Sequence, residues 1–212
     1  MEKFKNNYII QAWLVVFLSL CFGSALAGVQ LVLSPKIEAN KINETLTKVP
    51  ELILGKEGVK RLAKEGLSLK INPRRIQIKK NNRIISYKVF QAIEKGKVSG
   101  WVIKSSGRGY ADKIELLIGL NPSLNKISGL FIIEQKETPG LGNKIANLDF
   151  RKQFISKNTN TAIIASKTGA TSPNEIDAIT GATISSRSVC SIVNTAVKDL
   201  RSSLKKKQIK PM

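Results

Sequence analysis

The spacing of hydrophobic positions divides the chain into three parts. Residues 8–33 carry no charged side chain, and this run exceeds the ~20 apolar residues that cross a bilayer as a helix. Residues 67–133 alternate between apolar and polar side chains, as half-buried β-strands do. Residues 186–204 place apolar side chains at three- and four-residue intervals, which is typical of an amphipathic helix. The pattern predicts an α+β domain that follows one transmembrane helix.

The middle part should fold as a meander of short strands. Turn signals at residues 81–82, 95–97 and 121–122 interrupt the alternation. We expect these strands to form an antiparallel sheet with one buried face. An apolar run at residues 162–165 could add a further strand.

Two helices, at residues 149–155 and 186–204, should pack on the sheet and close the core. Ser185 or Ser186 is the expected N-cap of the last helix, because a serine hydroxyl can accept a bond from an unpaired backbone N–H. The buried face of that helix should comprise Val189, Ile192, Val193, Ala196, Val197, Leu200 and Leu204.

These patterns suggest a division of the chain into a cytoplasmic tail at residues 1–7, an anchor at 8–33, a stalk at 34–66 and a folded domain at 67–212. A cleaved signal peptide is the alternative, because Ala25-Leu26-Ala27 resembles a cleavage site. The apolar stretch continues past that site, which favours an uncleaved anchor. Lysines on both sides of the span leave its orientation open.

Composition narrows the possible chemistry. The formal net charge is +20, histidine is absent, and the two cysteines are Cys21 and Cys190. A histidine-dependent hydrolase, a histidine-ligated metal site and a four-cysteine cluster are therefore excluded. Arg108 and Tyr110 could contact nucleic acid, but the basic residues are dispersed and aromatic residues are only 6% of the chain. The charge instead favours anionic lipid head groups or acidic surfaces of partner proteins.

The stretch from Asp177 to Ser186 is the candidate functional site. Gly181 and Ala182 would let a ligand approach the backbone closely, and the helix that follows offers unpaired N–H groups and a positive dipole end. A phosphate group fits this description. An ordinary loop that caps an ordinary helix fits the same residues, and these residues alone do not separate the two interpretations.

Two motifs resemble those of the FMN-binding domain family. The first is Asp177-x-x-Thr180-Gly181-Ala182-Thr183-x-Ser185, and the second is the string Glu-Thr-Pro-Gly-Leu-Gly at residues 137–142. Together with the N-terminal apolar run, they make the chain similar to the G subunits of Rnf electron-transport complexes. The C subunits of sodium-translocating NADH:quinone reductases are close relatives of these. One departure is Ala178, where the motif often has glycine.

The resemblance implies FMN attached through its phosphate to the hydroxyl of Thr183 by a separate flavin transferase. The transferase would then recognise Asp177. Residues expected to shape the phosphate pocket are Thr180, Gly181, Ala182 and Ser185, and those expected near the flavin ring are Glu137, Thr138, Leu141 and Gly142.

The function implied by the resemblance is electron relay within an ion-translocating, ferredoxin- and NAD-linked membrane complex, rather than complete enzyme activity. The resemblance also places the folded domain on the outer face of the cytoplasmic membrane, among other subunits of the complex. A quinone-reductase C subunit and a stand-alone flavin carrier remain alternatives. So does a membrane-anchored protein that binds an acidic partner without redox chemistry.

Overall fold

The computed structural model describes residues 8–80, 82–206 and 209–211. The described part forms two compact units, which divide between Glu44 and Thr45. The elements in chain order are α1 (Tyr8–Lys64), β1 (Lys70–Lys80), β2 (Arg83–Glu94), β3 (Lys97–Arg108), β4 (Lys113–Leu120), β5 (Ile127–Glu134), the 3-10 helix η2 (Gly142–Ala146), α2 (Leu148–Lys152), β6 (Ile164–Ser166), β7 (Glu175–Asp177), α3 (Thr183–Lys205) and β8 (Ile209–Pro211).

The first unit consists of the N-terminal part of α1. This helix contains an 18-residue window with a mean hydropathy of 2.1, and none of that window is buried. By length and composition it could cross a membrane, and it is the one helix among the described residues that could do so. The expected anchor at residues 8–33 is helical throughout.

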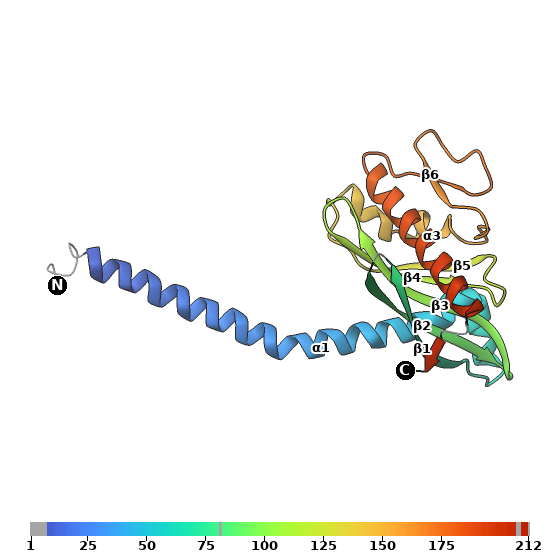
Figure 1. Ribbon diagram of the computed structural model, residues 1–212, viewed down its shortest axis with the longest axis horizontal. Helices are drawn as coiled ribbons and strands as arrows, with labels where there is room; N and C mark the ends of the chain where they lie inside the picture. The colour runs from blue at the N-terminus through green and yellow to red at the C-terminus, as the bar shows by residue number, and fades with distance from the viewer. Residues whose placement is uncertain (1–7, 81, 207–208, 212) are drawn as a thin grey trace. The chain divides into compact units, whose positions relative to one another are not determined.

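The second unit is built on a six-stranded antiparallel sheet with the order β5-β4-β3-β2-β1-β8 (Figure 1). The predicted meander is therefore confirmed, since β1 to β5 are neighbours in chain order. Asn82 lies in the first turn with a φ of 59°, a left-handed conformation that asparagine tolerates. The expected strand at residues 162–165 corresponds to β6, which pairs in parallel with β7 outside the main sheet.

The sheet is buried on both faces, whereas one buried face was expected. In β3, Trp101 and Ile103 join the larger core cluster under α3, while Val102 joins a second cluster on the opposite face. Successive side chains of a strand point to opposite faces, so the unbroken apolar run in β3 requires cover on both sides. The second cover is the C-terminal part of α1, through Val49 and Leu52.

Two glycines in the sheet leave room for α1 to pack against it. A Cβ on Gly119 would lie 2.5 Å from the carbonyl oxygen of Leu52, and a Cβ on Gly129 would lie 2.9 Å from the same oxygen. A side chain at either position would push the helix off the sheet. Residues 45–64 therefore belong to the compact domain, so the segment expected to be a stalk is only partly a linker. The helix breaks at Gly55, which has a φ of 69° and a ψ of 173°.

The last helix crosses the sheet (Figure 1) and buries the expected apolar face, except that Leu204 is only partly buried. It begins at Thr183, three residues earlier than expected, and its N-cap residue is Ala182, which makes no side-chain capping bond. Ser185 and Ser186 lie inside the first turn, so the prediction that one of them caps the helix was wrong. The helix expected at residues 149–155 is the shorter α2.

Candidate functional site

Thr183 is the first residue of α3 and is half-buried. The first backbone bond of the helix runs from the N–H of Ser186 to the carbonyl oxygen of Ala182, at 3.1 Å. The amides of residues 183–185 precede that bond and so have no carbonyl four residues earlier within the helix. The first turn contains no acidic side chain. An anion at Thr183 would therefore meet backbone donors and the positive end of the helix dipole.

Leu141 and Gly181 bring the two motif loops into contact. Gly181 has a φ of 79°, and a Cβ placed on it would lie 2.8 Å from Cδ2 of Leu141. Glycine is thus needed here both for its backbone conformation and for the space beside Leu141. The leucine side chain remains 42% exposed. It therefore has surface left for a ligand bound beside Thr183.

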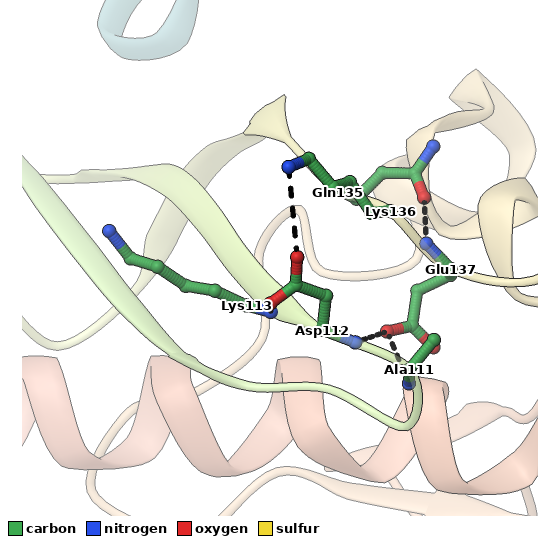
Figure 2. Close-up of polar contacts among 6 residues, drawn as sticks. All are labelled: Ala111, Asp112, Lys113, Gln135, Lys136 and Glu137. Carbon is green, nitrogen blue, oxygen red and sulfur yellow. Dashed lines mark hydrogen bonds and ion pairs between the residues drawn. The ribbon is translucent and has the colours of Figure 1, made fainter. Parts of the chain in front are cut away.

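Glu137 is buried, and its carboxylate connects segments of the site through hydrogen bonds. Its side chain is 5% exposed, and its carboxylate accepts a 2.5 Å hydrogen bond from the hydroxyl of Ser185 in α3. The same carboxylate accepts bonds from the backbone N–H groups of Tyr110 and Ala111, both at 3.2 Å, and of Asp112 at 3.5 Å. Figure 2 shows Glu137 directed at the 111–112 backbone.

This arrangement joins two residues whose roles beside the cofactor stay predictions. The family resemblance placed Glu137 beside the flavin ring and Ser185 in the phosphate pocket. In the structure both side chains are buried and bonded to each other. They therefore position the loops, because their polar atoms are already engaged within the protein.

Other motif residues divide into buried supports and exposed groups. Gly142 is buried, and a Cβ on it would lie 2.8 Å from Cβ of Glu137 and 2.9 Å from Oγ of Ser185. Ala182 is 6% exposed. The side chains of Thr138 and Thr180 are not held by these buried contacts, and we expect them to remain available to a ligand.

Ser186 fastens the Thr183 loop to its helix. Its hydroxyl donates to the carbonyl oxygen of Ala182 at 3.0 Å and accepts from the N–H of Ile179 at 3.1 Å. The side chain is fully buried. The hydroxyl thus fixes the backbone of the loop just before Thr183.

Asp177 lies at the end of β7 and is exposed. Its carboxylate accepts a 2.6 Å bond from the N–H of Ala170, and its own N–H donates to Oε1 of Gln153 at 2.7 Å. Asp177 therefore orders the neighbouring loop while keeping one face open to solvent. Recognition of this residue by a transferase stays a prediction.

Two exposed side chains near the site were missed by the sequence reasoning. Ile184 follows Thr183 in the first turn of α3 and is 55% exposed, and Tyr110 is 62% exposed on the turn bonded to Glu137. The signal for Ile184 was an apolar residue outside the buried stripe of an amphipathic helix. Tyr110 had been considered only as a nucleic-acid contact, because its proximity to Glu137 depends on tertiary structure.

The geometry agrees with a comparison against known protein families. Residues 109–198, which include both motif loops and the 109–112 turn, match the FMN-binding domain family. This part of the chain is therefore similar to FMN-binding domains.

Relatives of this chain are subunits of ion-translocating complexes. The chain is 34% identical over 122 residues to the G subunit of the proton-translocating ferredoxin:NAD(+) oxidoreductase complex of Clostridium ljungdahlii, covering 57% of this chain and 64% of that relative. It is 37% identical over 105 residues to the G subunit of the Na(+)-translocating ferredoxin:NAD(+) oxidoreductase complex of Acetobacterium woodii, covering 49% and 50% respectively. The match thus spans less than two thirds of the length of these relatives.

A solved structure shares the fold. The crystal structure of Shewanella oneidensis NqrC superposes with a TM-score of 0.63, covering 79% of this chain and 98% of that chain at 19% sequence identity. The similarity confirms the predicted α+β class, with an antiparallel sheet and packed helices.

Proposed function

We propose that the chain is a membrane-anchored flavoprotein subunit that carries covalently bound FMN and relays electrons within an ion-translocating, ferredoxin- and NAD-linked complex. The FMN-binding domain and the relatives from Clostridium ljungdahlii and Acetobacterium woodii support this function. The observation that carries the proposal is the contact between Leu141 and Gly181, because it places an exposed apolar side chain beside the loop that presents Thr183.

The residues present fit a phosphate group at Thr183. The first turn of α3 lacks carboxylates, and its leading amides point out of the helix end. Gly181 adds no side chain of its own just before Thr183, and Leu141 packs where a Cβ would lie. Thr183 would hold the phosphate through its hydroxyl oxygen, and the helix dipole would favour the remaining negative charge.

The surface beside Thr183 also fits a flat aromatic ring. Leu141 and Ile184 are exposed apolar side chains on the two contacting elements. Covering their apolar surface with a ring would be favourable, because that surface would leave water. The hydroxyls of Thr138 and Thr180 would bond the polar edge of the ring and the phosphate, respectively. When bound, FMN supplies the redox chemistry, while these side chains attach, orient and tune it.

Attachment requires a separate enzyme. A threonine hydroxyl is a weak nucleophile unless a base or a metal activates it, and the chain has no histidine. The nearest carboxylate along the chain before Thr183 is Asp177, whose Oδ1 is bonded to the N–H of Ala170. We therefore assign activation to a flavin transferase, with exposed Asp177 as part of the surface that it recognises.

The proposed location combines the anchor with the orientation that the family resemblance implies. Residues 8–33 would span the membrane once, with lipid and other subunits of the complex as partners and the domain on the outer face. Covalent attachment would keep FMN from being lost there. A phosphatase fused after Met212 should then be active outside the membrane, and activity confined to the cytoplasm would reverse the orientation.

The decisive experiment is Thr183→Val, compared with Thr180→Val. With a flavin transferase co-expressed, the parent protein should fluoresce after denaturing electrophoresis, and its mass should exceed the apoprotein mass by one FMN less one water. Thr183→Val keeps the shape of the side chain but removes its oxygen, so both signals should vanish. Thr180→Val should retain the covalent bond. Covalent flavin on Thr183→Val would contradict the assignment.

Two alternatives predict other results. A quinone-reductase C subunit or a stand-alone carrier would also bind flavin, but purification from the native membrane would recover different partners or none. A protein that only docks an acidic partner would remain colourless with an active transferase present.

A further inference from the structure

The domain has a pocket that is lined by residues outside the two motif loops. It has a volume of about 440 Å³ and lies between the second part of α1, the strand β5 and the helix α2. None of its lining residues belongs to the 137–142 loop or to residues 177–186. The proposed flavin site therefore does not account for it.

The pocket is strongly basic. Its lining includes Lys48, Lys56, Arg151 and Lys152, with Glu51 as the one acidic lining residue. The ammonium of Lys48 lies 3.5 Å from Glu51. Lys152 is also paired, with Asp149 at 2.6 Å. Arg151 and Lys56 are then in excess of these two carboxylates, so the concave surface attracts negative charge.

Two of these cations converge on one aromatic ring. Nζ of Lys48 lies 5.1 Å from the ring centroid of Phe131, and Cζ of Arg151 lies 5.2 Å from the same centroid. Lys48 comes from α1 and Arg151 from α2, so packing of the domain gathers both charges at β5. The ring stabilises each cation, but the two like charges repel each other. An anion between them would offset that repulsion.

Arg151 also has donor capacity left over. Its Nη1 donates to the carbonyl oxygen of Leu130 at 3.3 Å, but its Nε is buried without a hydrogen-bond partner. Burial lowers the pKa of Arg151, and the attraction of Glu51 opposes that shift. The charge is thus held in a setting that a bound anion would stabilise.

The rest of the lining is apolar. Leu52, Leu130 and Phe131 contribute to the wall, and the rim carries Leu148 and Ile155, which are 58% and 49% exposed. An inorganic ion alone would leave this apolar surface uncovered. An anion that carries an apolar group would use both parts of the pocket.

We propose that this pocket binds the phosphate of an amphiphilic anion, with Lys48 and Arg151 as the principal contacts and the Leu148–Ile155 rim against its apolar part. The phosphate could come from the head group of an anionic lipid or from a free organic phosphate. Lys56 would add positive charge to the lining, and Phe131 would keep the two principal cations in place.

The test uses the full chain in micelles of a neutral detergent, with binding measured by calorimetry. The probes are dioctanoyl phosphatidylglycerol, its zwitterionic counterpart dioctanoyl phosphatidylcholine, and glycerol 3-phosphate. The test variant is Lys48→Gln with Arg151→Gln. The matched control is Lys79→Gln with Lys97→Gln, which removes the same charge from exposed positions on the sheet.

The phosphatidylglycerol probe should bind the parent protein more tightly than the phosphatidylcholine probe, and the test variant should weaken it by about tenfold or more. The control variant should retain parental affinity. Equal binding of glycerol 3-phosphate would identify a free phosphate as sufficient, whereas weaker binding would identify the lipid. Lys48→Gln alone, at a side chain that is 36% exposed, serves if the double variant does not fold.

Three results would overturn the proposal. They are equal affinity for the two lipid probes, equal loss in the test and control variants, and an unchanged affinity after removal of Lys48. Because no residue of the flavin site is altered, covalent FMN should remain in every variant, and its loss would point to misfolding instead.

Discussion

The hydroxyl of Ser185 donates a 2.5 Å hydrogen bond to the carboxylate of Glu137, and both side chains are buried. This bond ties the first turn of α3 to the loop that carries Leu141. The backbone N–H of Tyr110 donates to the same carboxylate oxygen, so a third segment is fixed at the same point. The two motifs are thus parts of one structure, whose centre is a buried carboxylate rather than an exposed one.

Glu137→Gln should destabilise the domain more than Ser185→Ala. The glutamine amide retains one acceptor oxygen in place of two, and its NH₂ group would face donors. Loss of a buried charged acceptor typically costs about 1–3 kcal/mol, whereas loss of one hydroxyl costs about 1 kcal/mol. Chemical denaturation monitored by circular dichroism would measure both. Asp149→Asn is the control, because it removes an exposed carboxylate that is paired with Lys152. An equal effect there would remove the special role of Glu137.

Leu141→Ala should leave covalent attachment intact while loosening the packing of the flavin ring. Leu141 is half-exposed and lies on a different loop from Thr183, so the variant should fold and be modified normally. Flavin fluorescence and the reduction potential should both change relative to the parent. Leu148→Ala, at an exposed leucine outside the site, should change neither. Unaltered fluorescence and potential in Leu141→Ala would show that the ring lies elsewhere.

Gly119→Ala should displace α1 from the sheet. The added Cβ would meet the carbonyl oxygen of Leu52 at 2.5 Å and Oγ of Ser128 at 2.8 Å, and a backbone oxygen cannot move without shifting the helix. Overpacking of this kind costs about 1–3 kcal/mol. Thermal unfolding and proteolysis near residue 55 would report the loss. Ser106→Ala, at an exposed position of β3, is the control and should unfold like the parent. Parental stability in Gly119→Ala would mean that α1 does not pack there.

Stability should fall at alkaline pH because of two buried acids. Burial first, and then the 2.7 Å hydrogen bond to Asp199, raises the pKa of Tyr87, and burial raises the pKa of the Cys190 thiol to about 12. Both groups ionise more readily in the unfolded chain, near pH ~8.5 for cysteine and ~10 for tyrosine. The two groups therefore contribute fully to the free energy of unfolding below about pH 8. This contribution is lost as the pH rises above the pKa values of the unfolded chain toward those of the folded protein.

Denaturant midpoints between pH 7 and pH 11 would measure this loss. Tyr87→Phe should lower stability by about 1–2 kcal/mol at pH 7, because the carboxylate of Asp199 loses a donor. The variant should also lose less stability than the parent protein as the pH rises above 10. Tyr110→Phe changes an exposed tyrosine and should leave the profile unaltered, while a parental profile in Tyr87→Phe would refute the explanation.

The sequence by itself determined the main elements and the identity of the two motifs. Period-two alternation and turn residues specified β1 to β5, because side chains of a strand alternate between faces regardless of the rest of the fold. The three- and four-residue spacing specified the buried face of α3 for a similar local reason. The sequence also showed Gly181 just before Thr183, where a residue without a side chain lets another group approach the backbone closely.

Tertiary structure alone decided which polar residues face the ligand. The spacing of Glu137 and Ser185 could not reveal that they bond to each other across 48 residues of chain, because that contact depends on how β5 and α3 lie in space. Likewise, the segment expected to be a stalk enters the core through Val49 and Leu52. Its sequence has weak periodicity, and its place on the sheet is set by Gly119 and Gly129, which lie far along the chain. Both outcomes depend on contacts between residues that are far apart in the sequence. Local sequence patterns do not reveal such contacts.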